Sequence, residues 1–438
     1  MTQRMMWAVI GAGACCGSLW AQSTGPAVFV ANNGNLEGSV SSMLVNPDGT
    51  LTFRDKYITG TRPNTTVFHP GTNAQTISIS PNGKYLAAGH GTSSNTVEQL
   101  TILRVAADGG LSLAGIFSTP DSPLDVLWLR DDTLAATATG NSPNGVYVYR
   151  FNENGGGPGV PTLQQIDFEQ TGSFTSSLAK GPFNFLYANN SSGSTIHPFQ
   201  IESNGTLTQL PVYSAPALPL GLGASQGPNP DKQWVYAGGG ISSGGRAIVG
   251  ARLTLAGTLQ PIDGSPFTSG GNAPKQVVVS PDTSLAFVAH GSESSVRSFT
   301  IDPATGALTA TGFVRVVGIQ GSLGEIGVMR NWLFACDRDT INDGVRGLMS
   351  FTVMPNGSFP QNGTTVDTLG ITPNELAVWR GLCVGDVTGD LVVNFADLNV
   401  VLSQFGQTGV GLQGDVNGDG VVNFGDLNII LSNFGTVC

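Results

Sequence analysis

Residues 77–88 of the chain, ISISPNGKYLAA, consist of two short strand-like runs separated by a Pro-Asn-Gly turn. Such runs on either side of a tight turn predict a pair of antiparallel strands. The same plan returns at residues 277–289 as VVVSPDTSLAFVA. Each copy continues into a third strand-like run and then into a Gly-containing turn before a fourth. Each therefore predicts a unit of four short strands, which is one blade of a propeller.

Between residues 26 and 380 this unit recurs about every 45 to 50 residues, a period typical of propeller blades. Turns such as Asp48-Gly49-Thr50-Leu51 recur before the outermost strands, where Gly supplies a positive φ. We count seven units, although six or eight remain open if a long loop hides or mimics a blade. They lie near residues 26–57, 75–118, 122–170, 172–213, 218–265, 273–312 and 320–368.

The first unit lacks a leading strand, because it opens directly at Ala27-Val28-Phe29-Val30. A strand-like segment without a partner in the seventh unit lies at residues 374–380. We predict that this segment completes the first blade, which closes the ring and removes exposed sheet edges.

These repeats resemble the seven-bladed, lactonase-like (6-phosphogluconolactonase-like) propeller family, over about four-fifths of the chain. The resemblance implies an active site on the ring axis built from His, Arg and Glu. The family's Arg pairs are not evident here, because the matching position reads Pro274-Lys275-Gln276. His90 and His290 occupy equivalent blade positions, which favours a structural role. Glu325 and Glu375 begin inner strands and are candidates to face the channel; no residue is assigned as catalytic.

The C-terminal segment, residues 382–438, contains another pattern twice. Its six aspartates are its only charged side chains, and oxygen-bearing residues fall at loop positions 1, 3, 5, 9 and 12. That spacing is typical of EF-hand-type calcium loops, in which position 7 contributes its backbone carbonyl. The twelve predicted ligand positions are Asp386, Thr388, Asp390, Val392, Asn394 and Asp397 in loop 1, and Asp415, Asn417, Asp419, Val421, Asn423 and Asp426 in loop 2.

Each loop is followed by one short helical pattern and preceded by none, so the segment resembles a type I dockerin. The resemblance implies two Ca²⁺ ions and a cohesin-like protein partner. Loop 1 has Leu391 where the sharp turn prefers Gly, whereas loop 2 has Gly420. We therefore expect the second site to bind calcium more strongly. At loop positions 10 and 11, where dockerins often present hydroxyl residues, the chain has Phe395-Ala396 and Phe424-Gly425.

The first 21 residues predict an export signal, with Arg4 before an apolar run and Ala21 at the expected cut. Lipidation at Cys15 or Cys16 is a weaker alternative. In an exported protein, Cys383 and Cys438, which bracket the tail, are expected to form a disulfide. Cys336 lies in a strand-like run and is expected to be a buried thiol.

The predicted organisation is therefore a signal peptide (1–21), a mainly β propeller (22–381) and a small α-helical, calcium-loop dockerin-like domain (382–438). With no long apolar run or basic cluster, we expect neither a membrane span nor nucleic-acid binding. Two functions remain. One is a secreted scaffold with an unknown ligand on the propeller axis, tethered through its tail. The other is a secreted hydrolase, lactonase-like or active in polysaccharide catabolism, docked in the same way.

Overall fold

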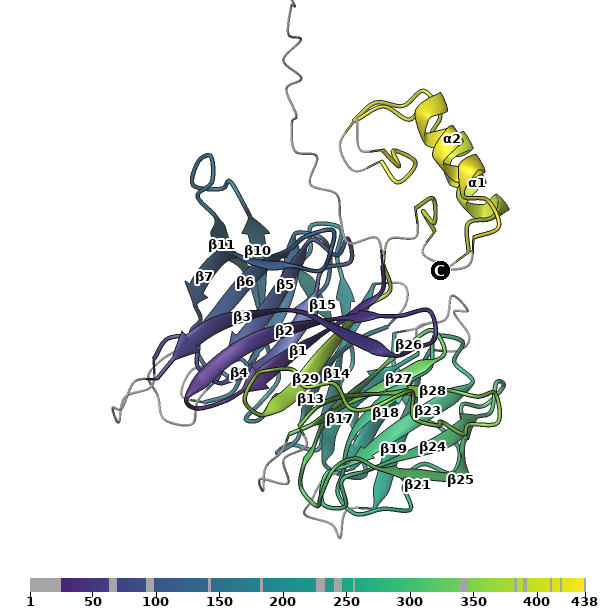
Figure 1. Ribbon diagram of the computed structural model, residues 1–438. Coiled ribbons are helices and arrows are strands. Elements are labelled where there is room, and N and C mark those ends of the chain that lie inside the picture. The colour runs from purple at the N-terminus through teal and green to yellow at the C-terminus, as the bar shows by residue number, and fades with distance from the viewer. Residues whose placement is uncertain are drawn as a thin grey trace, which may run out of the picture.

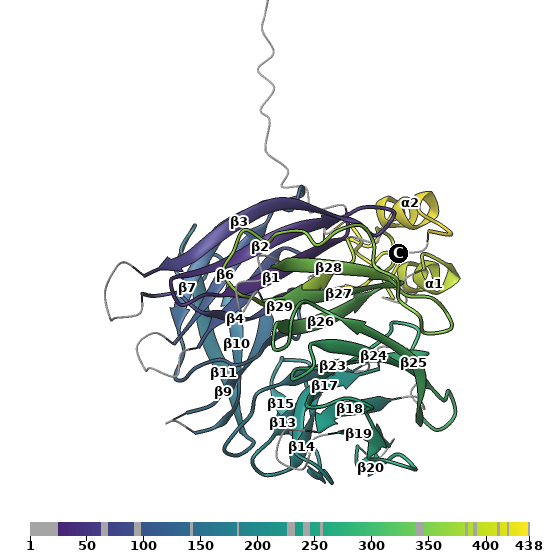
Figure 2. The same ribbon diagram turned by 60° about the horizontal axis from the view of Figure 1, so that its bottom comes forward.

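The computed structural model describes residues 25–62, 69–91, 98–140, 143–181, 184–225, 233–239, 246–254, 257–338, 346–381, 384–388, 392–409, 412–417 and 420–436. Its strands form seven antiparallel sheets around one axis, which confirms the predicted seven-bladed β-propeller (Figures 1 and 2). The predicted export signal lies outside the described residues. No helix within these ranges is long and apolar enough to span a bilayer.

The strands of the first three blades follow one another from the axis outwards. Blade 1 consists of β29 (Pro373–Trp379), β1 (Ala27–Asn33), β2 (Glu37–Val45) and β3 (Leu51–Thr61). Blade 2 consists of β4 (Ala74–Ile79), β5 (Tyr85–His90), β6 (Gln99–Val105) and β7 (Leu111–Ser118). Blade 3 consists of β8 (Val126–Trp128), β9 (Thr133–Ala138), β10 (Gly145–Asn152) and β11 (Thr162–Gln170).

The outer edges of the later blades are less regular. Blade 4 contains β12 (Leu178–Gly181), β13 (Phe185–Asn190), β14 (Thr195–Ile201), and an outer strand in two pieces, β15 (Leu207–Gln209) and β16 (Tyr213–Ser214). Blade 5 contains β17 (Pro219–Ala224), β18 (Trp234–Gly239), β19 (Ala247–Leu253), β20 (Leu259–Pro261) and β21 (Phe267–Thr268). Blade 6 contains β22 (Pro274–Val279), β23 (Leu285–His290), β24 (Ser295–Ile301) and β25 (Leu308–Val316).

Blade 7 differs from the four-strand expectation. It has β26 (Leu323–Met329), β27 (Trp332–Asp337) and β28 (Gly347–Thr352), while its outer position holds only two isolated bridges, Leu348–Val366 and Phe351–Gln361.

The predicted closure of the ring is confirmed. β29 pairs antiparallel with β1, with Val378 opposite Val28 and Leu376 opposite Val30. Figure 1 shows this late strand beside the purple N-terminal strands, although almost the whole propeller sequence separates them.

The turn chemistry repeats from blade to blade. Ser80 Oγ accepts the Tyr85 N–H at 3.0 Å, and the Gly83 N–H donates to the Ser80 carbonyl at 2.8 Å. Ser280 makes the same two bonds in blade 6, with Leu285 and Thr283 as the donors. The Ser-Pro-Asn and Ser-Pro-Asp sequences at Ser80 and Ser280 thus build the same turn, because the serine hydroxyl caps the returning strand.

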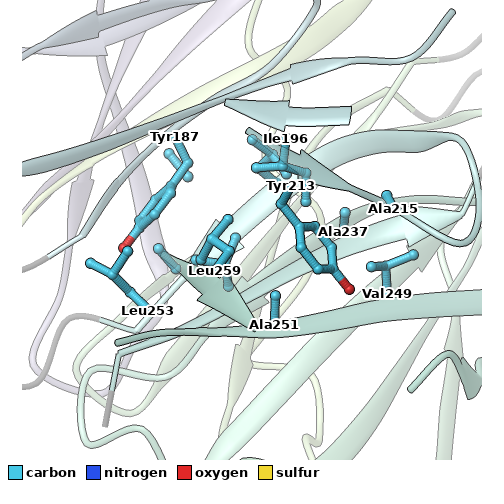
Figure 3. Close-up of a cluster of buried hydrophobic side chains, with 13 residues drawn as sticks. Tyr187, Ile196, Tyr213, Ala215, Ala237, Val249, Ala251, Leu253 and Leu259 are labelled. Carbon is cyan, nitrogen blue, oxygen red and sulfur yellow. The ribbon is translucent and has the colours of Figure 1, made fainter. Parts of the chain in front are cut away.

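The core is divided among the seven junctions between neighbouring blades, and each junction holds one apolar cluster. In β1, Phe29 packs toward blade 2, whereas Val28 and Val30 pack toward blade 7. Strand residues alternate between two faces, and here both faces are buried, so the runs are almost continuously apolar. Figure 3 shows the junction of blades 4 and 5, where Tyr187 and Tyr213 lie over Leu259 and Ala251.

The C-terminal unit contains two helices, α1 (Phe395–Ser403) and α2 (Phe424–Ser432), around its own small core. The fully buried residues of this core are Val393, Val401, Val422 and Ile430. Each helix begins with a capping box, in which Asn394 or Asn423 caps the first turn and Asp397 or Asp426 bonds back.

Candidate functional site

The first candidate site is the pair of predicted calcium loops. In loop 1 the Thr388 hydroxyl lies 3.4 Å from Asp386 Oδ1 and 2.9 Å from Asp397 Oδ1, so three predicted ligands converge. In loop 2 the Gly420 N–H donates to Asp415 Oδ2 at 2.8 Å, and Gly420 has φ +84°. Asp390 and Asp419, the predicted ligands at position 5, lie outside the described residues.

The remaining predicted ligands also lie at these loops. In both, the amide at position 9 donates to the carbonyl at position 7: Asn394 to Val392 at 3.0 Å and Asn423 to Val421 at 3.1 Å. Asp426 Oδ1 accepts the backbone N–H of Asn417 at 3.0 Å. Burial acts to raise the pKa of Asp397 and Asp426, but backbone hydrogen bonds outweigh it and hold both values low. These carboxylates are therefore ionised at neutral pH, as calcium ligands must be.

Backbone bonds tie the two loops together with approximate two-fold symmetry. Val393, which follows loop position 7, donates to Thr436 beyond α2 at 2.9 Å. Val422, its equivalent, donates to Gln407 beyond α1 at 3.0 Å. Each loop is thus anchored to the chain that follows the other helix, which makes the unit a cooperative pair.

The same symmetry places aromatic residues on the surface. Phe395 contacts Phe434 and Phe405 contacts Phe424, each with ring centroids 5.0 Å apart. Phe395 and Phe424 are 68% and 69% exposed. Two large apolar side chains therefore lie largely exposed on the surface of this small unit.

The second candidate site is the channel on the propeller axis, where the inner strands form a cavity of about 500 Å³. One residue at or just before the start of each inner strand occupies an equivalent position around the channel. In blade order these are Glu375, Thr76, Asp125, Ser177, Gly221, Gln276 and Glu325.

Five of these side chains accept a backbone N–H from the next blade. Two examples are Leu178 N–H to Asp125 Oδ2 at 2.7 Å and Ile326 N–H to Gln276 Oε1 at 2.8 Å. The other three donors are Ile77, Val126 and Leu222. Most of these polar residues therefore join neighbouring blades, which is a structural role.

Glu325 departs from this pattern. Its Oε2 accepts a bond from Gln276 Nε2 at 3.0 Å, and among the described residues it makes no bond to blade 1. Glu325 and Glu375 both line the axial cavity, as their places at the starts of inner strands predicted.

Three carboxyl groups face the cavity with raised pKa values. Burial raises the pKa of Asp125, and the charge of Glu325 raises it further. Burial, Glu325 and Asp125 together hold the pKa of Glu375 well above its ordinary value. Burial also raises the pKa of Glu325, although Lys275 and Arg338 oppose this. Acids in such a site bind protons or cations readily near neutral pH.

Two cations lie near these acids. Lys275 lines the axial cavity, donates to the Leu323 carbonyl at 2.9 Å, and has a pKa lowered to about 8 by burial, against the opposing effect of Glu325. Arg338 lines a second cavity of about 620 Å³ at the mouth, together with Asn73, Gln75 and Phe174. Within the described chain, neither cation and none of the three acids forms an ion pair.

The histidines do not contribute to either cavity. His90 and His290 are fully buried at equivalent strand ends, and burial lowers both pKa values to about 4. Cys336 is the buried free thiol that its sequence predicted, and burial raises its pKa. Asp125, Lys275 and Arg338 were not identified as channel residues in the sequence. Aligning the starts of the inner strands reveals Asp125, whereas Arg338 leaves no sequence signal.

The fold has solved relatives at low identity. No family model and no curated protein matches the sequence. A protein of Bacteroides fragilis, provisionally named a 6-phosphogluconolactonase, is 16% identical with a TM-score of 0.63, covering 81% of this chain and 98% of its own. A similarly named protein of Bacteroides uniformis is 15% identical with a TM-score of 0.63, covering 82% and 100%. The periplasmic gluconolactonase of Pseudomonas aeruginosa is 22% identical with a TM-score of 0.55, covering 68% and 84%.

Proposed function

We propose that this protein is an exported binding propeller, attached to a protein partner through a calcium-dependent, dockerin-like tail, with a small ligand on the propeller axis. The observation that carries the attachment is the convergence of Asp386, Thr388 and Asp397 in loop 1, together with the equivalent bond from the Asn417 N–H to Asp426 in loop 2. A tail whose only charged groups are six aspartates needs cations to offset their repulsion.

The two loops supply the oxygen donors that Ca²⁺ prefers. The acids at positions 1, 5 and 12, the polar residues at positions 3 and 9, and the carbonyl at position 7 would hold one ion in each loop. When bound, calcium neutralises the carboxylates. The chain itself positions them, since the capping boxes fix Asp397 and Asp426 at the helix starts.

Calcium titration of the full chain tests this proposal. Because Gly420 adopts φ +84° at loop position 6 and loop 1 has Leu391 there, Asp415→Ala should weaken calcium binding more than Asp386→Ala. Calorimetry should detect two sites, and Asp263→Asn, an exposed propeller residue, should leave both unchanged. Absence of calcium binding would contradict the attachment proposal, and a larger loss at Asp386 would contradict the order of the sites.

A cohesin-like partner would meet an apolar surface here. Phe395 and Phe424 occupy the positions from which dockerins contact their partners, and both are exposed. Changing both to Ser should abolish binding to a cohesin domain while leaving calcium binding intact. Undiminished binding would show that this surface is not used.

Export and oxidation of the tail are part of the same proposal. The mature protein should begin at Gln22, and Cys383 should be bonded to Cys438. N-terminal sequencing and non-reducing peptide mapping check both. An intact N-terminus, or two free thiols, would contradict them.

A hydrolase is the second candidate. It is favoured by the raised pKa values of Asp125, Glu325 and Glu375 beside Lys275, since a general base works best when its pKa lies near the operating pH. Solved neighbours named as gluconolactonases suggest D-glucono-lactone as the first substrate to assay. Hydrolysis that is lost in Glu325→Gln would establish it, whereas a rate equal to that of the buffer would exclude this substrate.

A further inference from the structure

The axial channel contains separated charges of both signs. Asp125, Glu325 and Glu375 come from blades 3, 7 and 1, while Lys275 and Arg338 come from blades 6 and 7. Among the described residues none of the five is ion-paired, although all lie in or beside two cavities. Burying a charged group without a partner costs free energy, so the presence of five such groups at the channel calls for a functional explanation.

At the throat, the acidic charge is concentrated on one arc. Thr76 donates its single hydroxyl proton to Glu375 Oε1 at 2.8 Å, and Thr76 Oγ1 also lies 3.3 Å from Asp125 Oδ1. This one hydroxyl proton cannot form a full hydrogen bond with both carboxyl groups. Lys275 is the cation with the largest opposing effect on the pKa of Glu325, and it lies on β22 of blade 6, beside the blade that carries Glu325. Among the described residues neither Asp125 nor Glu375 forms an ion pair, and the charge of Glu375 acts on Lys275 less than that of Glu325 does.

At the mouth, one unsatisfied donor has the opposite preference. Arg338 Nε is buried and has no hydrogen-bond partner among the described residues. Asn73, which is 7% exposed, has a buried Oδ1 that also lacks a described partner, and this acceptor favours a hydrogen-bond donor instead. Both residues line the mouth cavity, where Gln75 adds an amide and the 39% exposed Phe174 adds an apolar surface. A guanidinium in this setting favours a carboxylate ligand.

A metal ion does not fit this arrangement. Across the described ranges, no three acidic, histidine or cysteine side chains lie close enough to hold one. The cavities of about 500 and 620 Å³ instead have the size of small-molecule sites.

We propose that the channel binds a small zwitterion of the amino-acid class, with its carboxylate at Arg338 in the mouth and its ammonium group at Asp125 and Glu375 in the throat. This inference rests on the proposed axial ligand and names its chemistry. Because the pKa values of Asp125 and Glu375 are raised, an ammonium group that enters the site displaces protons from these acids, which makes binding depend on pH. Binding therefore tightens as the pH rises toward 8.

The test uses the full chain in saturating Ca²⁺, titrated calorimetrically with three probes of equal length. They are 6-aminohexanoate, hexanoate and hexylammonium. The zwitterion should bind at least about tenfold more tightly than either singly charged probe, since each charge pair contributes separately. Equal affinities for all three probes, or no binding of the zwitterion at millimolar concentration, would overturn the inference.

The variants separate the two ends of the site. In Arg338→Gln, 6-aminohexanoate should no longer bind more tightly than hexylammonium. In the double variant Asp125→Asn with Glu375→Gln, it should no longer bind more tightly than hexanoate. Asn and Gln still accept the Leu178 and Ile77 N–H groups, so the blades stay joined. The matched controls are Arg252→Gln and Asp263→Asn, both exposed and outside the cavities. Variants that fold and keep wild-type discrimination would refute the assignment, and the calcium titration stays independent of either result.

Discussion

At the residue scale, one glycine of an inner strand allows two blades to pack closely because it has no side chain. Gly221 is the inner-strand residue of blade 5 that corresponds to the bonding side chains of the other blades. A Cβ there would lie 2.4 Å from the Lys275 carbonyl oxygen. The absence of a side chain thus allows blades 5 and 6 to approach closely beside the channel.

Gly221→Ala should therefore destabilise the propeller by about 1–3 kcal/mol, because the added methyl group overpacks a backbone contact. Thermal melting measures the loss. Gly25→Ala is the matched control, since nothing lies within 4 Å of the Cβ it would add. Equal melting temperatures for the two variants would show that blade 5 relaxes freely.

At the element scale, β29 closes the ring, because this strand from the end of the propeller sequence completes the first blade. Its residues pack on both sides: Trp379 and Ala377 toward blade 2, and Val378 and Leu376 toward blade 7. Without it, the inner edge of β1 would be unpaired.

Val378→Pro should destabilise the ring by about 3 kcal/mol or more, because proline removes a donor from a strand and clashes with its neighbour. Circular dichroism should show a lower, broader unfolding transition. Val384→Pro, just beyond the strand and 48% exposed, should leave the propeller transition in place. A similar loss in both would mean that the substitution acts outside the β1–β29 ladder.

At the scale of the whole molecule, closure of the ring brings distant acids together. Glu375 has a raised pKa because it is buried with Glu325 and Asp125. The Glu375 carboxyl group therefore keeps its proton to a higher pH in the folded protein than in the unfolded chain. The stability from this group is complete below the unfolded pKa of about 4 and is lost as the pH rises through the folded value.

Glu375→Gln should thus flatten the decline in melting temperature that begins as the pH rises above the unfolded pKa of about 4. The other titratable and charged groups at the channel are Asp125, Glu325, Lys275, Arg338 and Cys336. Lys275, whose pKa is lowered to about 8, acts in the opposite direction, because its contribution to the stability of the folded protein increases as the pH rises above that value. The Glu375→Gln substitution should leave the direction of this contribution unchanged. Asp263→Asn should retain the wild-type slope; an equally steep decline in Glu375→Gln would contradict the assignment.

The sequence by itself predicted the blade repeat, its Ser-Pro-Asn and Ser-Pro-Asp turns, the closing strand and the two loop-helix repeats, whereas the structure settled the count at seven blades. These features depend on local chemistry, such as the bond from Tyr85 to the Ser80 hydroxyl, and on alternation along a strand, so a short window suffices to predict them. The loss of a regular fourth strand in blade 7 was not predictable, because it depends on pairing beyond Gly347–Thr352.

Only the tertiary structure decided which charged residues share the channel. The sequence marked Glu325 and Glu375 as candidates for the channel, but it did not show that Asp125, Lys275 and Arg338, which are far from them in the chain, lie in or beside the same cavities. Ring closure places β29 beside β1 and burial removes water from the axis, so these charges act on one another at short range. The predicted calcium loops are the reverse case, because twelve consecutive residues contain each set of proposed ligands, so their spacing can be recognised in the sequence without knowledge of the fold.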